Sequence, residues 1–182
     1  MGSIGKDFKF KVIKNFLSKD ELDLLSIYGE IKHRTNADSF DSVQNNNWDT
    51  YYYGDPIMES ILFKKKHIIE KEVNLNLLGT YAFWRMYTKF SELKKHTDRP
   101  ACEISVTVNI NSDGTEWPIY MDGEAMNLNI GDAAIYLGCE VEHWREPFLG
   151  DYQMQAFLHY VNKDGKYKDH YLDKRIFWGI NK

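Results

Sequence analysis

The spacing of hydrophobic residues divides the chain into a helical first part and a β-rich second part. After an alternating segment at 8–15, apolar residues recur at helical spacing between 22 and 28. Ser18 and Glu21 stand three apart just before them and have the form of a capping box. Gly54-Asp55-Pro56 is typical of a turn and predicts a second helix whose apolar residues run from 57 to 73.

From residue 80 onward the pattern predicts short strands separated by turns. We expect strands at 81–88, 103–111, 119–121, 124–128, 133–137 and 153–161. Turn dipeptides lie between them: Asp113-Gly114, Asp122-Gly123, Gly131-Asp132 and Gly150-Asp151. Helices followed by closely spaced strands indicate an α+β, mainly β fold, a double-stranded β-helix (jelly roll) buttressed by N-terminal helices. We predict a single domain over 1–182, with a helical buttress at about 1–79, a jelly-roll core at about 80–162 and a C-terminal extension at 163–182.

Composition narrows the function classes. Aromatic residues make up 15% of the 182 residues, which favours β-structure. The net charge of -4 gives no general attraction to phosphate backbones, so no nucleic-acid partner is expected. No apolar run approaches the ~20 residues of a membrane span, so no membrane partner is expected either. The two cysteines lack CxxC spacing and suit a reducing compartment, which predicts a cytoplasmic location.

The candidate chemistry lies in His96-Thr97-Asp98 and the later His143. Residues two apart on a strand end share one face, so His96 and Asp98 can grip one ion together. His143 would complete a two-histidine, one-carboxylate set, which covers one face of an octahedral Fe(II) and leaves positions open for a cosubstrate and O2. Zinc could use the same ligands but usually takes a tetrahedral set richer in nitrogen or sulfur. An isolated His-x-Asp triplet also occurs by chance in surface loops.

In their order along the chain, these residues resemble the Fe(II)- and 2-oxoglutarate-dependent oxygenase superfamily, in its prolyl-hydroxylase-like branch. The resemblance covers most of the chain. It rests on Val12–Leu22, Arg85-Met86-Tyr87, His96-Thr97-Asp98, Gly131–Tyr136, and His143 followed by Pro147 and Gly150. It implies a dioxygenase that binds Fe(II) through His96, Asp98 and His143 and uses 2-oxoglutarate as cosubstrate. Its products would be a hydroxylated substrate, succinate and CO2, with ascorbate as a candidate reductant. Because the ligand Asp98 is present, hydroxylation is favoured over halogenation.

One position departs from the family pattern. The resemblance predicts a basic residue about ten positions after the distal histidine, to pair with the distal carboxylate of 2-oxoglutarate, but Gln153 stands there. A neutral amide can bond a carboxylate without neutralising it. By family analogy Tyr87 points inward to the cosubstrate, and strand alternation puts Arg85 on the same face. We rank Arg85 and Arg99 as replacement cations ahead of Arg145.

The substrate is not specified by any motif, and a prolyl, peptidyl or small-molecule substrate fits equally. Specificity is expected in the polar loop at 34–47 and the aromatic residues that follow it at 48–53. We expect His159 to line the barrel as a hydrogen-bonded structural residue. Two alternatives remain: a non-catalytic jelly-roll binding module, and an iron oxygenase that does not use 2-oxoglutarate. The oligomeric state is not predicted.

Overall fold

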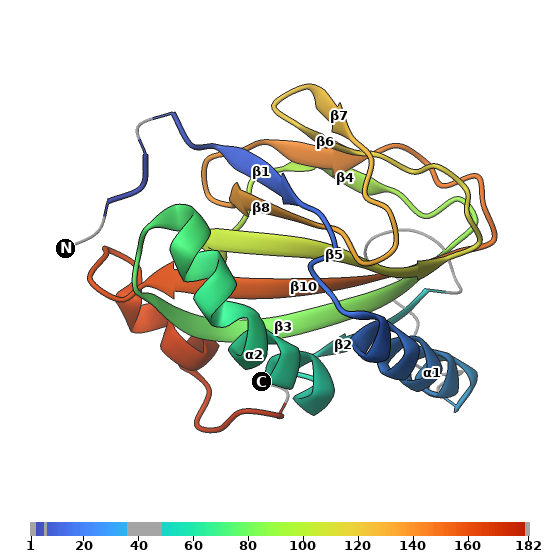
Figure 1. Ribbon diagram of the computed structural model, residues 1–182, viewed down its shortest axis with the longest axis horizontal. Coiled ribbons are helices and arrows are strands. Elements are labelled where there is room, and N and C mark those ends of the chain that lie inside the picture. Colours follow the sequence, from blue (N-terminus) through green and yellow to red (C-terminus); the bar gives the residue numbers. More distant parts are fainter. Residues whose placement is uncertain (1–2, 6, 36–48, 181–182) are drawn as a thin grey trace.

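The computed structural model describes residues 3–5, 7–35 and 49–180, and in them two antiparallel β-sheets lie face to face (Figure 1). The helices are α1 (Lys19–Thr35) and α2 (Pro56–Val73), with 3-10 turns at Pro100–Cys102 and Lys168–Lys174. The strands are β1 (Phe10–Ile13), β2 (Thr50–Tyr53), β3 (Leu77–Thr88), β4 (Leu93–His96), β5 (Ile104–Ser112), β6 (Ile119–Met121), β7 (Glu124–Met126), β8 (Ala133–Leu137), β9 (His143–Arg145) and β10 (Tyr152–Asn162).

The large sheet has the strand order β1-β8-β5-β10-β3-β2, and the small sheet has the order β4-β9-β6-β7. The small sheet covers one face of the large sheet, while α1 and α2 lie on the other side (Figure 1). This is the predicted double-stranded β-helix with a helical buttress, so the expected fold class is confirmed.

Both helices begin where the sequence indicates, because their first turns are capped. The backbone N–H of Ser18 donates to the Glu21 carboxylate (2.7 Å), and the Glu21 N–H donates to the Ser18 hydroxyl (3.3 Å), which is the predicted capping box. Asp55 caps α2 by accepting bonds from the N–H groups of Ile57 (3.0 Å) and Met58 (3.2 Å). The buried Tyr160 hydroxyl then donates to the backbone oxygen of Leu62 (2.7 Å) and ties β10 to α2.

The two faces of the large sheet differ in chemistry. Its outer face is apolar and packs under the helices; members of this core include Trp84, Met86, Val106, Ile135 and Leu158, all buried. Its inner face, which looks toward the small sheet, carries polar and aromatic side chains: Tyr81, Arg85, Tyr87, Ser105, Thr107, Gln155 and His159, also buried. Strand alternation produces this division. The polar inner face is therefore the surface on which a site can be built.

The sequence did not indicate three of the strands: β2, β4 and β9. Strands β4 and β9 have four and three residues, too few for alternation to be recognised, and they carry the two predicted histidine ligands. Strands β1 and β2 fall within the segment assigned to the helical buttress but pair with the large sheet. Most of the loop expected at 34–47 lies outside the described residues, as does Trp48, while Arg34 and Thr35 belong to α1.

Among the described residues, none of the helices has the length and apolar character needed to cross a membrane.

Candidate metal centre

The three predicted ligands lie at one end of the antiparallel strand pair β4–β9. His96 is the last residue of β4, and His143, the first residue of β9, is its partner in the register. Asp98 follows two residues after His96, and its backbone N–H donates to the backbone oxygen of Gly138 (2.7 Å). The structure thus brings together His96, Asp98 and His143, the residues that the sequence singled out.

Their ligand atoms converge. Oδ1 of Asp98 lies 3.6 Å from Nε2 of His96 and 3.7 Å from Nε2 of His143, and the three atoms lie within 4.8 Å of one another. Each imidazole uses its other nitrogen locally: Nδ1 of His96 donates to the oxygen of Lys94 (2.7 Å), and Nδ1 of His143 donates to that of Val141 (3.0 Å). Such bonds fix the tautomer that leaves the Nε2 lone pair for a metal. The donor set therefore fits a divalent ion of the iron type.

Asp98 is held by neighbours that leave Oδ1 facing the histidines. Its other oxygen, Oδ2, accepts a hydrogen bond from the Ser105 hydroxyl (2.8 Å). The Ser105 oxygen lies 3.0 Å from Nδ1 of His159, which is buried and lines the same cavity, as expected of a structural histidine. A Cβ atom on Gly138 would stand 2.5 Å from Oδ2 of Asp98, so only glycine allows this approach.

The electrostatics suit a cation. Burial alone would raise the pKa of Asp98, but its contact with His96 and the nearby His159 and His143 outweigh burial and lower it. The contact with Asp98 raises the pKa of His96. Burial lowers the pKa of His143, and lowers that of His159 to about 4. At neutral pH an anionic carboxylate therefore faces the deeply buried, neutral imidazole of His143.

A cavity of about 320 Å³ opens beside these ligands between the two sheets. Its walls are mostly aromatic, with Arg85 as a polar member; the lining residues are Tyr51, Tyr81, Phe83, Arg85, Tyr87, Leu93, His96, Asp98, Ile119, Tyr136, His143, Phe157 and His159. Aromatic walls around a few convergent polar groups are typical of small-molecule sites.

The two arginines ranked first for the cosubstrate are both ion-paired. Arg85 lines the cavity, and its Nε and NH2 atoms lie 2.9 and 2.8 Å from Oδ2 of the buried Asp49. The guanidinium of Arg99 makes a bidentate pair with Asp173, at 2.6 and 2.7 Å, and is absent from the cavity lining. Both positive charges already have carboxylate partners.

Arg145 lies in a different environment. It is 3% exposed and donates to the backbone oxygen of Trp117, whose ring is 4.5 Å from the guanidinium carbon. Within the described part of the chain, no carboxylate forms an ion pair with it. Burial lowers its pKa to about 10, although Tyr87 and Tyr136 act in the opposite direction. Arg145 is thus a buried cation without an anionic partner among these residues.

Gln153 and Tyr87 are neighbours across the strand pair β3–β10. Tyr87 is buried and lines the metal cavity, as the family resemblance implies. Gln153 is also buried but lines a neighbouring pocket together with Asn109 and Trp117, not the metal cavity. No cation therefore stands at the position where the family pattern places one.

The sequence did not indicate Ser105, Gly138 or Asp173 as site residues. Their partners lie 7 residues away for Ser105 and 74 for Asp173, and no local motif marks such contacts. Asp98, Cys102 and His159 form a second set of possible ligands, but that set shares Asp98 with the first. Burial raises the pKa of the Cys102 thiol, which disfavours the thiolate that a metal needs.

Comparison with solved structures identifies the architecture. The chain superimposes on a prolyl-4-hydroxylase from Pseudomonas putida with a TM-score of 0.66 and 17% identity, over 86% of this chain and 94% of that one. The fold is that of the 2-oxoglutarate- and iron(II)-dependent oxygenases. The predicted resemblance to this superfamily, prolyl 4-hydroxylases included, is confirmed at the level of structure.

Two further members of this oxygenase fold have ligands in their structures. The viral collagen prolyl hydroxylase vCPH from Paramecium Bursaria Chlorella virus-1, a 2-oxoglutarate complex, matches with a TM-score of 0.63 and 14% identity, over 85% of this chain and 96% of that one. HygX from Streptomyces hygroscopicus, with nickel, 2-oxoglutarate and hygromycin B bound, matches with a TM-score of 0.65 and 12% identity, over 86% of this chain and 84% of that one. No family model and no curated protein matches the sequence. At these identities the likeness concerns the fold and not the substrate.

Proposed function

We propose that this oxygenase-fold protein is an Fe(II)- and 2-oxoglutarate-dependent dioxygenase that hydroxylates a prolyl, peptidyl or small-molecule substrate. The observation that carries the proposal is the convergence of two Nε2 atoms and one carboxylate oxygen on a single point in the cavity. His96, Asp98 and His143 would hold the iron. Bound there, iron would supply the oxygen chemistry that couples decarboxylation of 2-oxoglutarate to succinate with hydroxylation.

The contacts favour Arg145 as the residue that binds the distal carboxylate of 2-oxoglutarate. Residues 143 and 145 of β9 point to the same face, about 6.7 Å apart along the strand. That spacing is comparable to the length of a five-carbon dicarboxylate whose other end lies at His143. Arg145, like Arg99, is absent from the cavity lining, but Tyr87, which lines the cavity, lies close enough to influence the Arg145 charge. An anion beside Arg145 would offset the cost of its buried charge.

The surrounding residues would orient the ligands and exclude water. Leu93 and Ile119 lie on the small-sheet side of the cavity, and Phe83 and Phe157 lie on the large-sheet side. A cavity of about 320 Å³ must hold the cosubstrate as well as the reacting part of the substrate, so that part is small. The proposal includes a reducing compartment, since Cys102 and Cys139 are both free thiols. Ascorbate remains a candidate reductant.

The test is an anaerobic titration of 2-oxoglutarate into the Fe(II)-loaded protein, monitored through the weak visible charge-transfer band of keto-acid chelation. We expect a saturable band that His96→Ala abolishes. Arg145→Gln should raise the 2-oxoglutarate concentration needed for half-saturation by about tenfold or more, because a charge-assisted bond is lost. Arg145→Lys keeps the charge and should lose less. Iron binding itself should change little in both variants.

Arg85→Gln and Arg99→Gln are the matched comparisons, because the sequence ranks these cations first. If Arg85→Gln or Arg99→Gln raises the 2-oxoglutarate concentration needed for half-saturation and Arg145→Gln does not, the arginine replaced in the affected variant binds the distal carboxylate. Iron binding without any band in the wild-type protein would favour an iron oxygenase that does not use 2-oxoglutarate, for which Gln153 is expected. Absence of iron binding would favour the non-catalytic binding module.

A further inference from the structure

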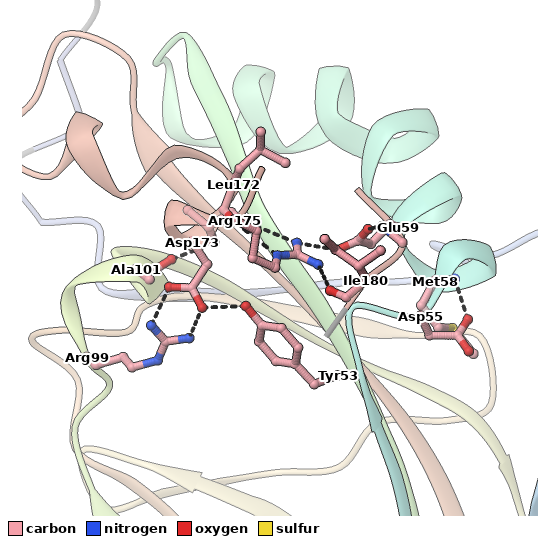
Figure 2. Close-up of polar contacts among 12 residues, drawn as sticks. Tyr53, Asp55, Met58, Glu59, Arg99, Ala101, Leu172, Asp173, Arg175 and Ile180 are labelled. Carbon is pink, nitrogen blue, oxygen red and sulfur yellow. Dashed lines mark hydrogen bonds and ion pairs between the residues drawn. The ribbon is translucent and has the colours of Figure 1, made fainter. Parts of the chain in front are cut away.

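The C-terminal segment contacts Arg99, the residue next to a proposed metal ligand, through Asp173. This side chain is 1% exposed and belongs to the 3-10 segment Lys168–Lys174, beyond the last strand. Its carboxylate accepts two hydrogen bonds from the Arg99 guanidinium, at 2.6 and 2.7 Å, and one from the Tyr53 hydroxyl, at 2.5 Å (Figure 2). Arg99 is the residue directly after the ligand Asp98.

The segment holds Asp173 in place at the cost of backbone strain. Leu172, Asp173 and Lys174 have φ values of 56°, 51° and 62°, a left-handed conformation that non-glycine residues rarely adopt in succession. The next residue, Arg175, fixes the position of the segment. Its guanidinium pairs with the buried Glu59 (2.5 Å) and donates to the backbone oxygen of Ile180 (2.8 Å) (Figure 2). Strain of this kind persists where surrounding contacts fix the conformation.

Arg99 and Asp98 lie near the same aromatic ring. The guanidinium carbon of Arg99 is 4.7 Å from the centre of the Tyr81 ring, and Tyr81 lines the metal cavity together with Asp98, whose charge acts on the Tyr81 hydroxyl. Tyr53, the other donor to Asp173, packs on Tyr81 with ring centres 4.8 Å apart. A guanidinium released at this position would have the Asp98 carboxylate as a nearby partner, and arginine–carboxylate pairs are among the stronger hydrogen-bonded pairs in proteins.

We propose that Asp173 is a positioning residue for the metal site: it binds the Arg99 guanidinium and so leaves the Asp98 carboxylate available to the metal. The proposal rests on the iron site proposed above. Asp173 touches neither the metal nor the cavity; its effect passes through Arg99. The chain thereby uses its C-terminal extension to keep a cation away from an anionic ligand.

The test is anaerobic Fe(II) binding by isothermal titration calorimetry, without 2-oxoglutarate or substrate. Asp173→Asn should weaken Fe(II) binding by about tenfold, in the range seen when a partner of a metal ligand is removed. Asp173→Asn combined with Arg99→Gln should recover most of that loss, since no guanidinium remains to compete for Asp98. Asp169→Asn removes the same charge from an exposed position in the same segment and should bind Fe(II) as the wild type does.

A second pair of variants serves if Asp173→Asn does not fold. Lysine cannot form the bidentate fork with Asp173, so Arg99→Lys leaves a loosely held cation beside Asp98. Arg99→Gln leaves no cation at this position. We therefore expect the conservative Arg99→Lys to weaken Fe(II) binding more than Arg99→Gln does, even where Arg99→Gln costs more thermal stability.

The inference would be overturned if Asp173→Asn bound Fe(II) like the wild type. It would also be overturned if the double variant bound Fe(II) as weakly as Asp173→Asn alone, or if Arg99→Gln bound Fe(II) more weakly than Arg99→Lys. Wild-type protein that binds Fe(II) but gives no band with 2-oxoglutarate would contradict the proposed function alone and leave this comparison valid. Wild-type protein that binds no Fe(II) would overturn both.

Discussion

The Ser105 hydroxyl donates a 2.8 Å hydrogen bond to Oδ2 of Asp98, and so determines which carboxylate oxygen faces the two histidines. Oδ1, the other oxygen, lies 3.6 and 3.7 Å from the Nε2 atoms of His96 and His143. Carboxylates that bind metals are commonly oriented by such outer contacts. The relationship makes the site depend on residues that are not ligands.

Replacing Ser105 tests that dependence directly. Ser105→Ala should weaken Fe(II) binding by about tenfold, because Asp98 loses the bond that orients it. The Fe(II) dissociation constant, measured anaerobically by calorimetry, gives the result. Ser112→Ala, on the same strand and half-buried, is the control and should leave the constant unchanged. Equal Fe(II) affinity in the wild type and Ser105→Ala would mean that the backbone alone positions Asp98.

Gly138 should tolerate no side chain. A Cβ atom there would lie 2.2 Å from the backbone oxygen of Cys102 and 2.5 Å from Oδ2 of Asp98, so one of these groups must move. We expect Gly138→Ala to lower the free energy of unfolding by about 1–3 kcal/mol, as overpacking does. It should also weaken Fe(II) binding. Urea unfolding and calorimetry measure the two effects.

Gly5→Ala is the matched control for this substitution, because no atom lies within 4 Å of a Cβ built there. It should change neither the free energy of unfolding nor Fe(II) affinity. A Gly138→Ala variant with wild-type metal affinity would show that the strand end adjusts without moving Asp98.

Metal should stabilise the folded protein, because the ligands are brought together only in the folded state. At an Fe(II) concentration 100 times its dissociation constant, we expect a gain of about 2.7 kcal/mol. For a chain of this length that corresponds to a rise in Tm of roughly 5–10 °C. Differential scanning calorimetry with and without a chelator measures it.

The control for metal stabilisation compares two histidines. His143→Ala should abolish the rise in Tm, while His67→Ala, an exposed position on α2, should retain it. A rise of equal size in both variants would place the metal elsewhere.

Glu21 should make the stability of the protein depend on pH. Burial alone would raise the pKa of Glu21, but Lys65, the Ser18 N–H and Lys64 together lower it to about 2 from an ordinary 4.5. Because the pKa is depressed in the folded state, the stabilisation is complete above about pH 4.5 and is lost as the pH falls toward 2. Glu21→Gln should therefore cost about 1–2 kcal/mol at pH 7 and little at pH 2.

Urea unfolding of the wild type and Glu21→Gln at both pH values checks this dependence. Glu30→Gln, an exposed position of the same helix in a looser 3.7 Å pair with Arg34, should cost little at either pH. A Glu21→Gln penalty that stays constant from pH 7 to pH 2 would assign the effect to the cap geometry and not to the charge.

The sequence by itself determined the features that depend on neighbours along the chain. The capping box of Ser18 and Glu21 joins residues three apart, so the pattern predicts it correctly, and the turn at Gly54-Asp55-Pro56 likewise precedes the second helix. The same holds for His96 and Asp98, which share a face because they are two residues apart. Together with the resemblance to known oxygenases, the order of helices, strands and His143 predicted the fold and singled out three residues whose ligand atoms converge.

Only the tertiary structure decided which charges pair with one another. By chain distance Arg99 stands beside a metal ligand, yet its guanidinium is bound by Asp173, 74 residues later. Arg85 is paired with Asp49, 36 residues earlier, whereas Arg145 contacts the backbone oxygen and the ring of Trp117 and has no carboxylate partner among the described residues. The availability of a cation for a ligand depends on which carboxylate the packing brings to it. Sequence periodicity carries no information about such a contact, because it describes the face of a strand and not the strand that lies opposite.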